Sequence, residues 1–285
     1  MDTQPIVEAN AVLATDVYGK SRVRLVRVIR HGDRHDLKEM TVNIRFEGDF
    51  ESCYRTGDNS RILPTDTMKN TVYALAKDSS VATAELFAQH LVEHFLSNNP
   101  QASRVEVSIA EHLWKRIDAT TFEQTGAEKR TTVVRADRQR TVVTSGIEDL
   151  VILKTTGSAF EGYIKDSLTT LPETNDRILA TAMKASWRYS KAVPYDTIWH
   201  GIRRSIVTAF AEHQSLSVQH TLFAIGERVL DTFEEVDEIH LTMPNKHCNL
   251  VDLSRFGLEN KNEIFVPIDE PHGYIEAKLV RTSAS

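Results

Sequence analysis

Apolar and polar residues alternate along several stretches of the chain, which is the pattern of a strand with one buried face. The clearest case runs from Met40 to Glu47, where every second residue is apolar. Similar alternation, or a short apolar run between charged residues, predicts the other strands. The expected strands are 21–31, 39–50, 105–114, 131–143, 151–153, 178–189, 239–243 and 274–280.

Other segments carry apolar residues every three or four positions, which predicts amphipathic helices. Each begins near a residue type that caps or starts helices. The expected helices cover 65–77, where Thr65 and Asp66 are the start signals, a segment after Thr83, residues 195–213 and a segment after Ser217.

The order strand, strand, helix, helix, strand, strand therefore occurs twice. This repeat favours two similar α+β domains with antiparallel strands and paired helices over a single sheet of βαβ units. The segment Thr-Ser-Gly-Ile-Glu at 144–148 interrupts the strand pattern. We therefore expect a first domain over 1–145 and a second over 146–285.

Two helix starts in the matching halves, at Thr65 and at Val218, present polar groups that would suit complementary walls of one site. Free backbone N–H groups and the helix dipole favour an anion at such a position. However, Thr and Asp are also ordinary helix caps, and Gln219 in a first turn is usually solvated. Each helix start alone therefore leaves both interpretations open.

The composition is that of a soluble globular protein, with 285 residues, 41% hydrophobic and 26% charged. A net charge of −6 argues against a nucleic-acid partner, which would favour a basic face. No apolar run approaches the roughly 20 residues that span a bilayer. The N-terminal Met-Asp-Thr-Gln-Pro lacks a secretory pattern and the C-terminal Thr-Ser-Ala-Ser lacks a peroxisomal signal, so a cytoplasmic location is expected.

Familiar cofactor and nucleophile motifs are absent from the sequence. It has no glycine pattern for nucleotide phosphates, no H-E-x-x-H zinc motif and no G-x-S-x-G elbow. Cys53 and Cys248 alone make neither a disulfide framework nor a zinc knuckle. His31 and His35 flank turn residues, and a solvated hairpin explains them better than a metal site. We expect an enzyme with this sequence to use neither a metal nor an organic cofactor.

Five motif regions, in the same order along the chain, resemble the urate oxidase family of the bacterial type. They are Tyr18-Gly-Lys20 with Asp58-Asn-Ser60 and Thr65–Tyr73, Leu153–Phe160, Asp176–Leu179, Ser217–Gln219 and Met243–His247. Each is moderately specific, whereas five in register between residues 16 and 280 make chance agreement remote. Cys248 and Asn249 depart from the family, which often has aromatic or apolar residues at these two positions. We expect this difference to change the local packing and not the role of His247.

The resemblance implies two tandem T-fold (tunnelling-fold) domains, each with four antiparallel strands and a pair of helices. It also implies a homotetramer that closes the sheets into a barrel, with active sites at subunit interfaces. Such closure would cover the sheet edges that an antiparallel fold leaves open. The implied reaction, in purine degradation, is the oxidation of urate by O2 and water to 5-hydroxyisourate and hydrogen peroxide without a cofactor.

The resemblance assigns proton abstraction to Lys20 and Thr65, with His247 completing the relay and positioning water. It assigns substrate binding to Thr65, Asp66, Phe160, Arg177, Val218, Gln219 and Asn245, the last of which would hold O2 or water over the ring. No metal ligand is implied. These residue types suit a planar anion, since Arg offers a planar fork of donors and Gln offers both a donor and an acceptor.

Two alternatives remain at this point. One is another T-fold enzyme, acting on a pterin or similar heterocycle with zinc or a nucleophilic cysteine. The other is a structural barrel or purine-binding module without turnover. Taken singly, Lys20 is typical of a surface lysine and Phe160 of a core aromatic, so only the joint match in order favours the urate oxidase interpretation.

Overall fold

The computed structural model describes residues 11–77 and 82–282. The strands are β1 (Tyr18–His31), β2 (Arg34–Gly48), β3 (Ala102–Arg116), β4 (Phe122–Asp137), β5 (Thr141–Lys154), β6 (Leu179–Tyr189), β7 (Val236–Thr242), β8 (Asn245–Leu250), β9 (Phe265–Gly273) and β10 (Glu276–Val280). The helices are α1 (Glu51–Thr56), α2 (Thr65–Ala76), α3 (Ala84–Asn98), α4 (Tyr195–Glu212) and α5 (Val218–Thr232), with a 3-10 turn η1 at Ser254–Phe256. The predictions that concern residues 1–10 and the C-terminal Ser-Ala-Ser lie outside the described residues.

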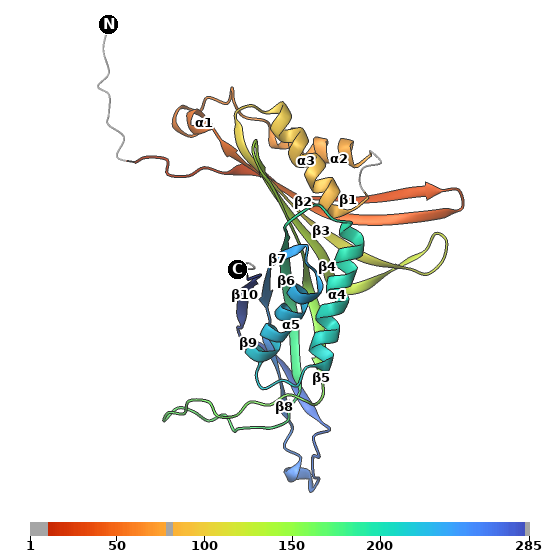
Figure 1. The fold of residues 1–285 in the computed structure, drawn as a ribbon, viewed down its shortest axis with the longest axis vertical. Helices are drawn as coiled ribbons and strands as arrows, with labels where there is room; N and C mark the ends of the chain where they lie inside the picture. Colours follow the sequence, from red (N-terminus) through yellow and green to blue (C-terminus); the bar gives the residue numbers. More distant parts are fainter. Residues whose placement is uncertain (1–10, 78–81, 283–285) are drawn as a thin grey trace.

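One antiparallel sheet runs through both halves in the order β1-β2-β3-β4-β5-β6-β7-β10, while β8 pairs with β6 and β9 pairs with β8. Figure 1 shows α2 and α3 over the β1–β4 part of the sheet and α4 and α5 over the β5–β7 part. The predicted repeat of two strands, two helices and two strands is thus present, with β8 and β9 inserted before the last strand.

The period of two places one row of apolar side chains under the helices. Ile44, Val107, Val134 and Val143 are cross-strand neighbours, and all four are buried in the single core cluster. The opposite face carries Ser, Thr and Asn side chains and a hollow of about 460 Å³. Because only one face packs against helices, the alternation in β2 was a reliable strand signal.

Two expectations about the middle of the chain are wrong. The single strand predicted over 131–143 is a hairpin, since the Asp137 carboxylate accepts from the backbone N–H groups of Gln139 (2.8 Å) and Arg140 (2.9 Å) and turns the chain. The expected interruption at 144–148 is also absent, because β5 continues through Gly146, where a Cβ would lie 2.5 Å from the carbonyl oxygen of Ala185. The division into 1–145 and 146–285 remains a proposal.

The predicted helix starts are confirmed in position, but only some of the residues at these starts cap their helix with a side chain. Thr83 Oγ1 accepts from the Leu86 N–H (3.2 Å) and Ser217 Oγ from the His220 N–H (3.1 Å), so both residues cap their helices. In contrast, α2 begins at Thr65 after Pro64 without a side-chain cap. The hydroxyl of Thr65 is therefore not used as a helix cap.

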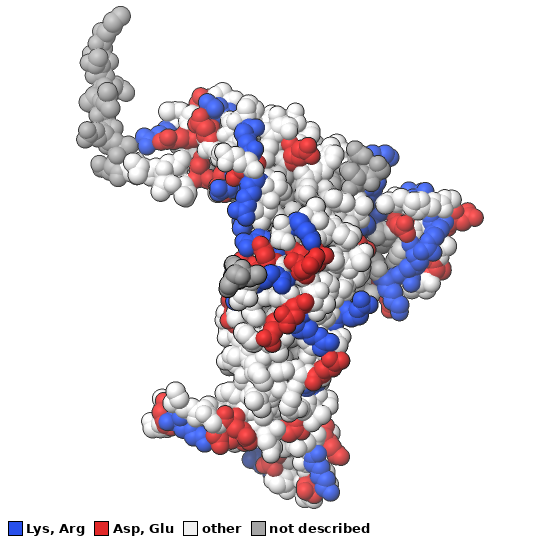
Figure 2. Space-filling model, viewed as in Figure 1, with Lys and Arg blue, Asp and Glu red and all other residues white. Residues whose placement is uncertain are grey.

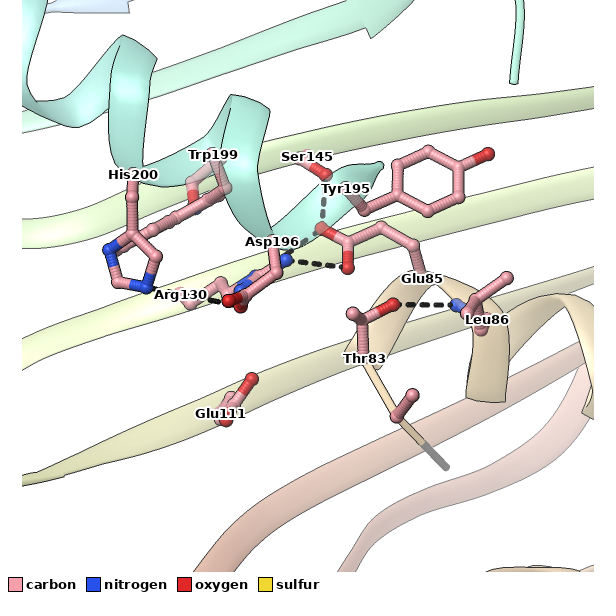
Figure 3. A network of polar contacts seen from close by, with 12 residues as sticks. Thr83, Glu85, Leu86, Glu111, Arg130, Ser145, Tyr195, Asp196, Trp199 and His200 are labelled. Carbon is pink, nitrogen blue, oxygen red and sulfur yellow. Dashed lines mark hydrogen bonds and ion pairs between the residues drawn. The ribbon is translucent and has the colours of Figure 1, made fainter. Parts of the chain in front are cut away.

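A buried arginine joins the two halves where β4 meets β5. Arg130 donates to Glu85 at the start of α3 (Nη2 to Oε2, 2.9 Å) and to Asp196 in α4 (Nη1 to Oδ1, 2.7 Å), and Ser145 of β5 also donates to Glu85. Figure 3 shows these groups converging from four elements. The Arg130 guanidinium also lies 5.1 Å from the centre of the Trp199 ring.

Two observations concern the apolar character of the helices and the distribution of charge on one face of the molecule. Within residues 11–77 and 82–282, no helix has the length and apolar character to cross a membrane. On the face seen in Figure 2, acidic and basic side chains are interspersed rather than gathered into one area of a single sign. The expectation of no nucleic-acid partner, which rests on the net charge of −6, stays a prediction.

The Arg130 network predicts a large cost for removing its buried carboxylate. Glu85→Ala should lower the free energy of unfolding by about 3–5 kcal/mol, because it leaves a buried guanidinium without its main counter-ion. Asp196→Ala is the matched control, since that side chain is 61% exposed and Arg130 keeps its Glu85 counter-ion. Its loss removes one hydrogen bond from the buried guanidinium and should cost about 1–3 kcal/mol, less than the loss of Glu85. Urea unfolding at equal subunit concentration measures both values, and a Glu85→Ala cost below that of Asp196→Ala would contradict the assignment.

Candidate active site

Four of the predicted site residues line one cavity of about 160 Å³ beside the start of β6. Phe160 and Arg177 come from the connection between β5 and β6, and Asn245 and His247 come from β8. The rest of the lining is Leu171, Pro172, Thr174, Ile178, Lys246, Cys248 and Asn249. The larger hollow on the helix-free face contains no predicted site residue, so size alone does not identify the site.

Backbone pairing explains how the two ends of the connection between β5 and β6 meet. The Phe160 N–H donates to the Thr174 carbonyl (2.7 Å), and the Arg177 N–H donates to the Ser158 carbonyl (2.8 Å). The Asp176 carboxylate accepts from Thr156 Oγ1 and from the Gly157 N–H, and the Thr156 bond is the main reason its pKa is lowered. The motifs 153–160 and 176–179 are therefore two sides of one local structure.

Arg177 is a half-buried cation for which the described residues provide no counter-ion. Within the described part of the chain no carboxylate pairs with it, and its buried Nε has no hydrogen-bond partner. Burial lowers the pKa of Arg177, because the charged form loses hydration. Its guanidinium carbon lies over the Phe160 ring, 5.2 Å from the ring centre. A desolvated planar cation beside an aromatic face is suited to a planar anion.

Val218 and Gln219 lie next to this cavity, although neither lines it. The Ala159 N–H donates to the Ser215 carbonyl (2.8 Å), so the strand-like segment that carries Phe160 runs beside the chain that enters α5. The Val218 side chain is buried and Gln219 is exposed at the first turn. Ser217 caps the His220 N–H, while the N–H groups of Val218 and Gln219 precede it in the first turn, near the Phe160 segment.

A pair of histidines stabilises the entry to α5. His213 Nε2 lies 3.2 Å from His220 Nδ1, the same nitrogen that accepts weakly from the Leu216 N–H. Burial, then the neighbouring His220 and Lys154, lower the pKa of His213. The lowered pKa favours the neutral form of His213 beside the predicted Val218–Gln219 wall.

The N-terminal group of predicted residues is brought together by Tyr18. Its hydroxyl accepts from the Leu63 N–H (3.0 Å), which holds the chain entering α2 against β1. Gly19 is required by close strand approach, because a Cβ there would lie 1.9 Å from the Ile44 carbonyl oxygen. The register of β1 against β2 shifts between Lys20 and Val23, and such irregularities commonly redirect side chains at functional sites.

At the start of α2, the Asp66 carboxylate is engaged within its own helix. It accepts from Lys69 (2.5 Å) and Asn70 (3.1 Å). The Lys69 hydrogen bond is the main cause that lowers the pKa of Asp66, and the charge of Lys20 adds to it. Lys20 therefore lies close enough to Asp66 to interact, while it makes no ion pair with the described residues.

The group of Lys20, Thr65 and Asp66 does not meet the Arg177 cavity within one chain. Lys20 lies on β1, and five strand-to-strand steps separate β1 from β6, on the order of 24 Å across the sheet. The row of paired residues that begins at Lys20 crosses β5 at Val143. Arg177 lies near Lys154 at the other end of β5, and Val143 and Lys154 are separated by on the order of 35 Å along the strand. In Figure 1, α2 and β8 lie at opposite ends of the molecule.

Several cavity residues had no recognisable signal in the sequence. Leu171, Pro172 and Thr174 belong to an irregular connection without periodicity, and β8 was not predicted as a strand. Cys248 lines the cavity directly after His247, so the departure from the family pattern falls in the wall itself. Only the pairing of β8 with β6 and β9 shows why the 243–247 motif reaches Arg177.

Comparison with known proteins identifies the family. A family model described as uricase matches residues 16–142 and 143–276. The uricase of Arthrobacter globiformis is 41% identical over 273 residues, covering 95% of this chain and 90% of that protein, and the uricase of Dictyostelium discoideum is 38% identical over 282 residues, covering 95% and 98%. The chain belongs to the uricase family. The predicted family and its oxidoreductase class are thereby confirmed, which decides against a pterin-type enzyme.

Solved structures agree with this assignment. The crystal structure of the uricase from Arthrobacter globiformis matches with a TM-score of 0.94 at 40% identity, covering 97% of both chains. A uricase from Bacillus fastidious has the same fold at 24% identity and a TM-score of 0.82. The predicted α+β architecture with two tandem T-fold units is therefore confirmed for this chain.

Proposed function

We propose that this protein oxidises urate with O2 and water to 5-hydroxyisourate and hydrogen peroxide, without a metal or organic cofactor. Family membership supports the substrate. The observation that carries the proposal is Arg177, a half-buried guanidinium without a carboxylate partner in the described chain, placed over Phe160 beside Asn245 and His247. Urate is a planar anion at neutral pH, so it would supply a negative charge for Arg177 and a flat ring that stacks on Phe160.

Each binding residue is proposed to contact a different part of the purine. Phe160 stacks on the ring, and Arg177 donates to its carbonyl and ring-nitrogen edge. The backbone of Val218 and the amide of Gln219 bind the other edge, where an amide matches alternating donors and acceptors. On the opposite rim, Thr65 and Asp66 contribute backbone and side-chain groups at the start of α2.

The proposed chemistry begins with proton removal by Thr65 and Lys20. A threonine hydroxyl is a poor base and needs a neighbour that takes the proton onward, which is the role proposed for Lys20. The deprotonated urate transfers two electrons to O2, which leaves as hydrogen peroxide after taking up two protons. Water, positioned by His247 and Asn245, then adds a hydroxyl group to the oxidised purine. Because the substrate itself is the reductant, the scheme needs no cofactor.

The complete site is proposed to form between subunits of a homotetramer. The separation of Lys20 and Thr65 from Arg177 across one sheet supports this arrangement, since a single chain holds only one wall at each end. The sheet also leaves β1 and β10 as edges in the isolated chain. Pairing of edges between copies would close the sheets into a barrel.

The direct experiment mixes the purified protein with urate in air. Loss of urate absorbance should be accompanied by one O2 consumed and one hydrogen peroxide formed per urate. Metal analysis should find no stoichiometric metal in the active protein. Dialysis against a chelator should leave the rate of urate oxidation unchanged. A folded, tetrameric protein that consumes no urate would contradict the proposed function and favour a purine-binding module.

The proton-relay assignment predicts a specific pattern in two variants. Thr65→Ala and Lys20→Met should each lower kcat by a factor of about 10², as expected when general-base assistance is lost. Thr67→Ala is a matched control on the same helix, because Thr67 is exposed and no role is assigned to it. Steady-state kinetics with peroxide detection gives the values. Near-normal turnover in Thr65→Ala would show that the relay is wrong even though urate is the substrate.

A further inference from the structure

A tyrosine outside the cavity stacks on the aromatic ring inside it. Tyr163 follows Phe160 in the connection between β5 and β6, and the two rings are nearly parallel, with an angle of 13° and centres 4.8 Å apart. This is an offset stacked pair, in which Tyr163 covers one face of Phe160. Tyr163 is itself not part of the cavity lining.

Tyr163 is also fixed to the other side of the same connection. Its hydroxyl donates to the carbonyl of Leu171, which does line the cavity. Glu173 accepts from the Gly162 N–H (3.0 Å) and pairs with Lys165 (3.2 Å), which holds the chain on both sides of Tyr163. The Lys165 ammonium lies 5.5 Å from the centre of the Tyr163 ring.

The backbone at Phe160 is already fixed by its reciprocal pairing with Thr174. What this pairing leaves open is the orientation of the half-buried phenyl ring, which turns about its side-chain bonds. The stacked Tyr163 ring supplies the missing restraint. A ring that is held in place before binding does not lose that freedom when a flat ligand stacks on it.

We infer that Tyr163 is a positioning residue that holds the Phe160 ring ready to stack on a planar purine. The inference rests on the proposed function for the identity of that purine. Since Tyr163 lies away from the reacting atoms, it should affect binding of substrate and transition state equally. Its loss should therefore raise KM and leave kcat nearly unchanged.

Three variants test this role. Tyr163→Leu removes the ring and keeps an apolar side chain, Tyr163→Phe keeps the stacked ring and loses the hydroxyl, and Leu168→Ala is a control in the same connection at a side chain that is 85% exposed. The KM and kcat for urate are measured for each, together with the Kd for xanthine, a flat purine used as the binding probe. Circular dichroism and thermal unfolding report whether each variant is folded.

Tyr163→Leu should raise the KM for urate and the Kd for xanthine by roughly 2- to 10-fold, the range that an aromatic pair contributes. Its kcat should stay within about two-fold, and Tyr163→Phe and Leu168→Ala should stay near wild type on the same scale. An unchanged Kd for xanthine in Tyr163→Leu would overturn the inference. A lower Kd would also overturn it, because it would show that Tyr163 competes with the purine for Phe160. Absence of urate oxidation by the wild type would contradict the proposed function, whereas the xanthine comparison would still decide the role of Tyr163.

Discussion

The continuous antiparallel sheet is the constraint from which the rest of the account follows. Its register fixes Lys20 at one edge and one end, and it fixes the Arg177 cavity several strands away at the opposite end. No rotation of side chains can join groups separated by this much ordered backbone. A chain built in this way keeps the two groups of candidate site residues apart, and in the proposed function a second copy of the chain brings them together.

Two arginines show how partners determine the role of a buried cation. Arg130 donates to Glu85 and Asp196, so its charge is compensated inside the chain and it joins the helices of the two halves. Arg177 has an unpartnered Nε and no carboxylate partner within residues 11–77 and 82–282. The first arrangement stabilises the fold, whereas the second leaves a desolvated donor for a ligand. The same residue type therefore serves structure at Arg130, whereas we propose that it serves recognition at Arg177.

The elements with a regular hydrophobic period could be predicted from the sequence, and those defined by side-chain turns or long-range pairing could not. The alternation in β2 and the helical spacing in α4 and α5 matched the structure because each element buries one face. The β4–β5 hairpin was missed because its turn has no Gly or Pro and depends on the Asp137 carboxylate. β8 was missed because it is short, polar and held only by its neighbours.

The candidate site divides in a similar way. Motif resemblance proposed Arg177 and His247 as site residues, but only the folded chain shows that they share a cavity with Phe160 and that Lys20 lies far from them. Tyr163 had no signal in the sequence, because the role we infer for it depends on a stacked geometry within an irregular connection. Residues that act through another side chain are the least visible in a sequence read without its structure.

The central claim is that each site takes its N-terminal wall from one chain and its Arg177 cavity from another. Mixing two impaired variants tests it most directly. Thr65→Ala and Arg177→Ala chains are refolded together in equal amounts, and urate oxidation is measured at urate concentrations below KM. Random assembly should give about one quarter of sites with both residues intact, and so about one quarter of the wild-type activity. Activity no greater than the average of the two variants alone would show that both walls come from the same chain and would contradict the account.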